Sequence, residues 1–128
     1  MLKDASWEVR LATAEALTRL GPDVVPDLFN ALLDTHAEVR AGAAWALGRM
    51  KTECVPALLA GLKSEKIEIR AGAMRALIKA GDASLPVLIP ALNEGTPEYR
   101  AAIAGIIGHY GPDAQEALPA LIEALKLK

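Results

Sequence analysis

The sequence predicts an all-α protein made of four copies of one pair of helices. A short phrase returns every 30 residues around Arg10, Arg40, Arg70 and Arg100, and self-similarity at a fixed period indicates one structural unit stacked on copies of itself. Apolar residues around each arginine follow helical spacing. No segment alternates apolar and polar residues over the length of a strand, so we expect no β-sheet.

The first helix of each unit, the A helix, is predicted at roughly residues 7–20, 37–50, 67–80 and 97–110. The second unit shows the helical spacing of apolar residues at Val39, Ala43, Ala46, Leu47 and Met50. Ser6 and Thr96 stand where an N-cap belongs. Glycine ends helices readily and is expected to do so at Gly21, Gly81 and Gly111, whereas the second unit has Lys51.

The second helix of each unit, the B helix, is predicted near residues 23–33, 53–63, 83–93 and 113–127. Each has a proline in its opening turn, where N–H groups lack helical partners anyway: Pro26, Pro56, Pro86 and Pro119. Pro90 is the one proline inside a predicted helix, and we expect it to kink or shorten the third B helix. Three extra residues before Pro119 most simply lengthen the turn before the last helix.

Composition limits the possible functions. The chain of 128 residues suits one domain, here 1–128, with units at about 4–33, 34–63, 64–93 and 94–128. A net charge of −2 gives no basic surface for phosphates, so we expect no nucleic-acid partner. No apolar run is long enough to span a bilayer, so we expect no membrane partner. The single cysteine, Cys54, fits a reducing compartment, and we expect a cytoplasmic location.

These phrases resemble HEAT-like repeats, which are similar to armadillo repeats, and in particular the short class described in phycobilin lyase subunits. The matching residues run from Glu38 to Leu47 and from Val55 to Leu62, and the resemblance covers essentially the whole chain. It implies a right-handed solenoid of four antiparallel helix pairs, with A helices on the convex side and B helices lining the concave side. It also implies a protein-binding scaffold, or alternatively an accessory subunit of a bilin lyase-like enzyme.

Each arginine of the repeat lies two residues after a glutamate, which gives the pairs Glu8 and Arg10, Glu38 and Arg40, Glu68 and Arg70, and Glu98 and Arg100. The glutamates fall in the first turn of the A helices, where negative charge is favourable. We expect the arginines to pair with loop acids such as Asp4, Asp34 and Glu94, or with the neighbouring glutamate. This arginine ladder is therefore interpreted as structural rather than as an anion-binding stripe.

Catalytic chemistry finds little support in the sequence. His36 is expected in a loop and His109 at a helix end, and neither has cysteines or carboxylates at metal-ligand spacing. Cys54 has no basic partner next to it in the sequence that would activate a thiolate. We therefore expect no enzyme, no catalytic residues, no cofactor and no metal.

We expect a protein partner of unknown identity on the concave face. The B-helix positions predicted to point away from the leucine core are small and apolar in the middle of the array and polar at both ends. Such a strip, rimmed by polar groups, is a plausible groove for a partner, although crowding alone would also favour small residues. The residues are Asp27, Asn30, Ala57, Ala60, Gly61, Val87, Pro90, Ala91, Ala120 and Glu123.

The two ends of the array suggest a further possibility. Terminal repeats of a solenoid need polar outer faces, yet the first helix offers Leu2 and Leu11, and the last unit has isoleucine where the two middle units have alanine or leucine: Ile103, Ile106 and Ile107. We therefore expect either end-to-end self-association or a fragment of a longer array with a purely structural role. On the outer surface, Trp45 is expected to stack on Arg49 or Arg75, or to anchor an interface.

Overall fold

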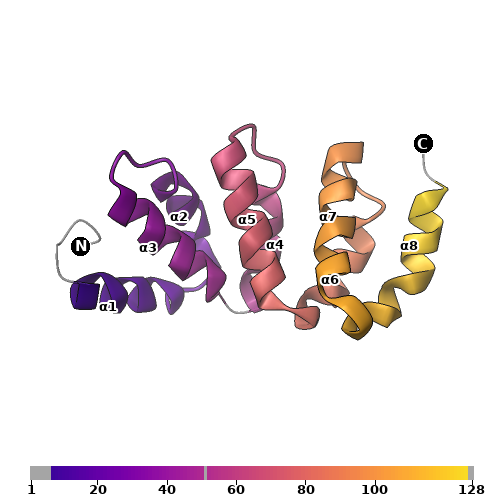
Figure 1. The fold of residues 1–128 in the computed structure, drawn as a ribbon, viewed down its shortest axis with the longest axis horizontal. Helices are drawn as coiled ribbons and strands as arrows, with labels where there is room; N and C mark the ends of the chain where they lie inside the picture. Colours follow the sequence, from indigo (N-terminus) through magenta and orange to yellow (C-terminus); the bar gives the residue numbers. More distant parts are fainter. Residues whose placement is uncertain (1–6, 51, 127–128) are drawn as a thin grey trace.

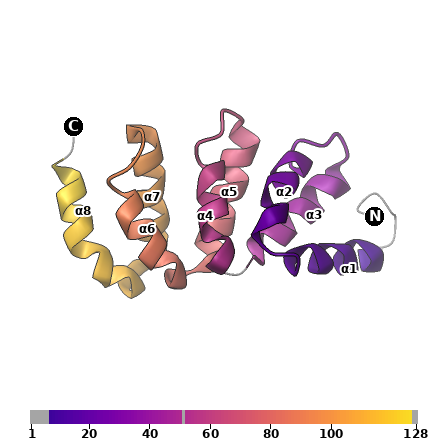
Figure 2. The ribbon, with the colours of Figure 1, turned by 180° about the vertical axis from the view of Figure 1, so that it is seen from behind.

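The computed structural model describes residues 7–50 and 52–126, which form helices and turns without any strand, so the all-α prediction is confirmed (Figure 1). The A helices are α1 (Trp7–Thr18), α3 (Ala37–Gly48), α5 (Ile67–Ala80) and α7 (Pro97–His109). The B helices are α2 (Val25–Ala31), α4 (Val55–Gly61), α6 (Leu85–Ala91) and α8 (Leu118–Leu125). Helices α3, α5 and α7 lie in front of α2, α4 and α6 in Figure 1 and behind them in Figure 2.

Each B helix is shorter than the sequence predicts because its opening turn is a separate 3₁₀ segment. These segments are η1 (Pro22–Val24), η2 (Thr52–Cys54), η3 (Asp82–Ser84) and η4 (Gly111–Ala117). The last one has 7 residues where the others have 3, so the extra residues do lengthen the turn before α8. Helix α6 is 7 residues long, as are α2 and α4, so the expectation that Pro90 shortens it is wrong.

Two predicted helix ends are confirmed, at Thr96 and Gly81, whereas α1 and α3 end two residues earlier than predicted, at Thr18 and Gly48. Thr96 caps α7, because its hydroxyl oxygen accepts a hydrogen bond from the backbone N–H of Tyr99 at 3.2 Å. Gly81 ends α5 with a φ of 80°, in the left-handed region where a side chain would be strained. The expected N-cap Ser6 and the exceptional Lys51 lie outside the described residues.

The two layers contact each other most closely between a B helix and the A helix that follows it. These pairs are α2 with α3, α4 with α5, and α6 with α7, while successive A helices also contact one another. The packed pair is therefore offset by half a unit from the sequence repeat. Helices α1 and α8 remain single at the two ends of the array, as Figures 1 and 2 both show.

The core consists of the small and branched apolar residues that the composition predicts. Leu28, Leu58 and Leu88 are at most 3% exposed, whereas Leu121 in the last helix is half-buried. A fully buried leucine contributes roughly 1.5–3 kcal/mol, so this continuous leucine spine stabilises the stack. Among the described residues, no helix combines the length and apolar composition needed to cross a membrane.

The isoleucines of the last unit are not the exposed end that the sequence suggested. Ile103, Ile106 and Ile107 are at most 1% exposed, because α7 packs against α6 on one side and against η4 on another. Their larger side chains belong to the core of the last unit. The expectation that they form an uncapped apolar face is therefore wrong. Leu11 of the first helix is 37% exposed, as expected, and Leu2 lies outside the described residues.

Candidate partner-binding surfaces

The B-helix face consists of side chains that point outward from the four B helices, and eight of the ten predicted residues lie on it. Asp27, Asn30, Ala60, Pro90 and Glu123 are exposed, and Ala57, Val87 and Ala120 are half-buried. The centre of this face is small and apolar, whereas carboxylates stand on its first and last helices. The face extends along α2, α4, α6 and α8 and so involves every unit.

Gly61 and Ala91 are buried, so their prediction as exposed residues of this face is wrong, although Gly61 lines the floor of the groove between α2 and α4. Ala91 is 2% exposed, and a Cβ atom added at Gly61 would lie 2.5 Å from Cζ of Phe29 and 2.8 Å from Cβ of Ala73. Gly61 and Ala91 are buried because each follows a buried leucine, Leu58 or Leu88, by three residues, and residues three apart share one side of a helix. That spacing was a signal in the sequence.

A shallow groove of about 340 Å³ lies on the B-helix face between α2 and α4. Its outer lining includes Pro26, Asn30, Ala57 and Ala60. Phe29 is 8% exposed and closes the floor of the groove. The groove therefore has an apolar floor and one amide side chain at its edge. Side chains of a protein partner can fill a groove of this composition.

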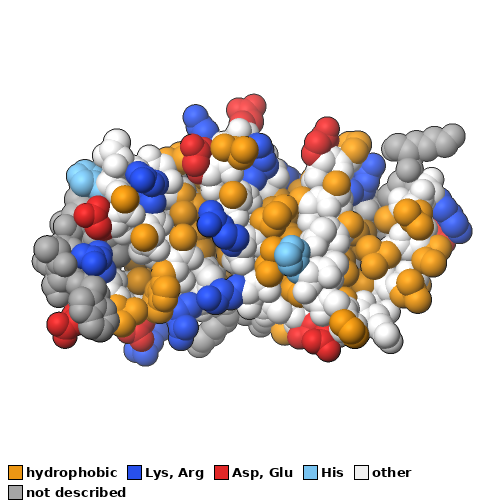
Figure 3. Space-filling model, in the orientation of Figure 1, with side chains coloured by type: hydrophobic (Ala, Val, Ile, Leu, Met, Phe, Trp, Pro, Cys, Tyr) orange, Lys and Arg blue, Asp and Glu red, His pale blue; other side chains and the backbone are white. Residues whose placement is uncertain are grey.

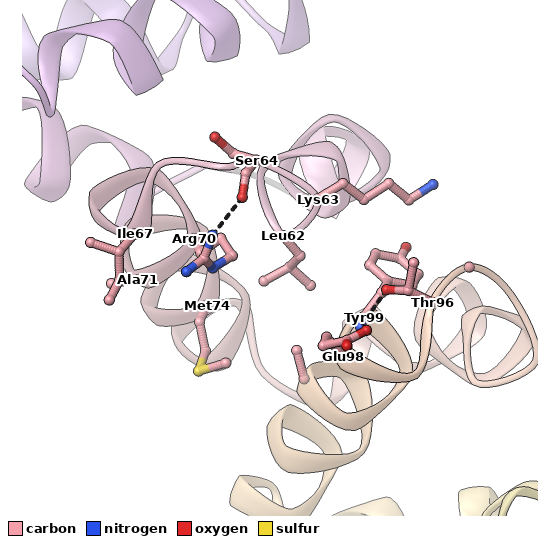
Figure 4. A pocket seen from close by; sticks show the side chains of 12 residues that line it. Leu62, Lys63, Ser64, Ile67, Arg70, Ala71, Met74, Thr96, Glu98 and Tyr99 are labelled. Atoms are coloured by element: carbon pink, nitrogen blue, oxygen red, sulfur yellow. Dashed lines mark hydrogen bonds between the residues drawn. The ribbon is translucent and has the colours of Figure 1, made fainter. Parts of the chain in front are cut away.

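A larger groove of about 840 Å³ lies between α5 and α7 (Figure 4). Leu62, Ala71, Met74, Tyr99 and Ala102 supply its apolar lining. Polar residues at its rim already have internal contacts: the Lys63 ammonium nitrogen lies 4.8 Å from the centre of the Tyr99 ring, and Arg70 is bonded to the loop. Burial raises the pKa of Tyr99, and the nearby charge of Glu94 raises it further.

Three of the four ladder arginines, Arg40, Arg70 and Arg100, bind main-chain carbonyls rather than the predicted carboxylates. One guanidinium nitrogen of Arg40 donates to the carbonyl oxygen of Asp34 at 2.7 Å, and Arg70 makes the same bond to Ser64 at 2.8 Å. Arg100 donates to Gly95 at 2.7 Å. Each acceptor lies in the loop that joins a B helix to the next A helix, where carbonyls at the helix end lack helical partners.

The remaining ladder residues behave as the sequence suggests or lie beyond the description. Glu8, Glu38, Glu68 and Glu98 are exposed in the first turns of the A helices. Arg10 is half-buried, and Asp4, its expected partner, lies outside the described residues. Arg40, Arg70 and Arg100 therefore fasten the turns between paired helices.

The residues considered for catalysis lie far apart in the fold. Nδ1 of His36 is 2.9 Å from a carboxylate oxygen of Asp34 at the start of α3, whereas His109 is exposed at the end of α7. Cys54 is buried before α4. Within residues 7–50 and 52–126, no three histidine, cysteine or carboxylate side chains lie close enough together to hold a metal ion.

Trp45 lies half-buried on α3, and the guanidinium carbon of Arg49 is 4.9 Å from the centre of a ring of its indole. Of the two arginines predicted to stack on it, Arg49 is confirmed. A cation placed over an indole contributes about 0.5–1 kcal/mol at an exposed site. The ring thus has a structural contact on its own helix.

Comparison with known sequences agrees with this architecture. A sequence-family model described as HEAT repeats matches residues 1–62 and 55–128, which together span the chain. No curated protein matches the chain. HEAT repeats commonly mediate protein–protein interactions or scaffolding and are generally non-catalytic.

Proposed function

Because the chain belongs to the family of HEAT-repeat proteins, we propose that it is a non-catalytic module that binds a protein partner on its B-helix face. The observation that carries this proposal is the row of exposed or half-buried side chains that runs from α2 to α8, which are small in the middle and polar at the ends. Small side chains allow a partner to approach the helix backbones closely. The polar groups of Asp27, Asn30 and Glu123 then orient the partner around the apolar centre of the face.

The larger groove between α5 and α7 is the competing surface, and two features favour the B-helix face over it. The groove occupies one junction between units, whereas the face extends across all four. In addition, Tyr99 is 4% exposed, and Lys63 and Arg70 already make internal contacts. A partner in the groove would have to compete with those contacts.

Recognition by this face needs little rearrangement, since its residues stand on short helices anchored by the leucine spine. Rigid surfaces lose little conformational entropy on binding. We propose a cytoplasmic location. The chain has a single cysteine, Cys54, whose thiol is buried, and a chain without disulfides suits a reducing compartment.

The test compares Ala60→Arg on the B-helix face with the matched Ala71→Arg in the groove between α5 and α7, and adds Val87→Arg as a second change on the B-helix face. Both alanines are exposed, so neither change should unfold the protein, and circular dichroism checks this. Proteins captured from the source cell by the immobilised wild type are then measured for binding to each variant. We expect Ala60→Arg and Val87→Arg to weaken binding at least about tenfold, by steric and charge exclusion.

The opposite pattern, in which Ala71→Arg removes binding and Ala60→Arg does not, would place the partner in the groove and overturn the proposed face. Unchanged binding by Ala60→Arg and Val87→Arg together would overturn it as well. A parallel absorbance titration with a free bilin separates the accessory-subunit alternative, because that role requires a tetrapyrrole to bind.

A further inference from the structure

We propose that copies of this chain associate head to tail, with α1 of one copy packed on α8 of the next in the way that α7 packs on α6. The proposal concerns the two ends of the array and does not depend on the B-helix face. It rests on equivalent positions of the 30-residue repeat that are buried inside the array and exposed at its ends.

Helix α8 exposes the residues that other B helices bury beneath the following A helix. Leu118 is 58% exposed, whereas its equivalent in α6, Leu85, is 0% exposed. Leu125 is 85% exposed, whereas its equivalent Leu92 is 0% exposed. Ile122 follows the same trend at 46%, and none of the residues of α8 is classed as buried. Within residues 7–50 and 52–126, no A helix therefore covers these residues of α8.

Helix α1 and its following turn expose the complementary residues. Val9 is 39% exposed, whereas Val39 at the same position of α3 is 7% exposed. Leu20 is 64% exposed against 6% for Met50. Ala16 is also exposed, although its equivalents Ala46 and Ala76 are at most 2% exposed. In the described part of the chain, no B helix packs on these residues as α2, α4 and α6 pack on α3, α5 and α7.

The space beside α8 has the composition that an incoming A helix needs. A groove of about 540 Å³ runs between α7 and α8, and its lining includes Leu92, Ala104, Leu121 and Ile122. Figure 3 shows apolar side chains gathered over this end of the molecule. An exposed apolar patch of this kind marks an interaction site, and α1 carries the residue pattern that fills the same position in the other units.

The two faces differ, so the contact is heterologous: a copy that uses its α8 still has its α1 available for another copy. Association should therefore build open chains rather than a closed dimer. The interface would continue the α6–α7 contact of the fold from one copy to the next.

The experiment uses Ile122→Glu to block α8 and Ala16→Glu to block α1, with Ile67→Glu as the matched control. Ile67 is an even more exposed apolar residue, at 67% against 46% for Ile122, and lies in the middle of the array. Sedimentation velocity over a concentration series reports the mass. We expect wild type and Ile67→Glu to grow with concentration, while each blocked variant associates at least about tenfold more weakly, because a buried unpaired carboxylate is unfavourable.

Mixing the two blocked variants is decisive, since Ala16→Glu still offers an intact α8 and Ile122→Glu an intact α1. We expect the mixture to form heterodimers and nothing larger. Continued self-association of Ala16→Glu alone would indicate an α8–α8 contact and overturn the head-to-tail arrangement. A wild type that remains monomeric at every concentration would overturn the proposal as a whole. Neither result would affect binding at Ala60, which keeps the two proposals separable.

Discussion

Replacing Gly61 by alanine tests the packing between successive units most directly. The added methyl group would lie 2.5 Å and 2.9 Å from two ring carbons of Phe29 and 2.8 Å from Cβ of Ala73. The Phe29 ring can move at its far end, but the Ala73 methyl is fixed to the backbone of α5. The substitution must therefore shift α4 relative to α5, at the closest contact between the two layers.

The magnitude follows from two opposing effects. Alanine in place of a helical glycine stabilises a helix by roughly 0.5–1 kcal/mol, while overfilling a packed site costs typically about 1–3 kcal/mol. Since two separate groups are approached too closely, we expect a net loss of about 1–2 kcal/mol. For a domain of this size that lowers the melting temperature by roughly 3–10 °C.

The matched control is Gly105→Ala in α7, where the added methyl meets nothing within 4 Å. This variant gains the helix propensity without the clash, so we expect an increase in stability of about 0.5–1 kcal/mol. Both variants are measured by urea and thermal unfolding followed by circular dichroism. Equal changes in stability in the two variants would refute the packing argument and would support the sequence-based prediction that Gly61 is exposed.

Three further predictions concern the contacts that fasten the helix ends. Arg70→Met removes the bond to the Ser64 carbonyl, and because Arg70 is exposed we expect a loss of about 0.5–1 kcal/mol in urea unfolding. Tyr110→Phe removes a 2.7 Å hydrogen bond from the hydroxyl to the Leu77 carbonyl, at about 0.5–1.5 kcal/mol. Burial raises the pKa of Tyr110 above 10.0. The protonated hydroxyl therefore contributes its full stabilisation below pH 10.0, and this contribution is lost as the pH rises through the raised pKa. Alkaline pH should consequently destabilise the phenylalanine variant less than the wild type. Thr96→Ala removes the cap of α7 and should cost about 1 kcal/mol, measured as a lower melting temperature.

Each of these outcomes has a contradicting result. A loss in Arg70→Met that vanishes at high salt would indicate a screened carboxylate pair instead of a carbonyl contact. Identical alkaline unfolding of wild type and Tyr110→Phe would show that ionisation of this tyrosine does not oppose folding. Unchanged stability of Thr96→Ala would mean that solvent caps α7 equally well.

The sequence predicted the fold because its signals are local. Period, capping and helix-ending residues act within a few positions of one another, so Thr96 and Gly81 could be placed without knowledge of their neighbours in space. The eight exposed or half-buried residues of the B-helix face follow from the same helical period. The assignments of Gly61 and Ala91 as exposed residues were wrong because each lies three residues after a buried leucine, Leu58 or Leu88, and so on the same side of its helix.

The amino-acid sequence by itself therefore determined the repeat, the two kinds of helix and the leucine spine. Only the tertiary structure decided which B helix pairs with which A helix, and hence that α1 and α8 are left single. It also decided that the ladder arginines reach loop carbonyls and that Ile103 is buried. These features depend on distances between groups up to a whole unit apart in the chain, and such distances are set by packing rather than by local backbone preference.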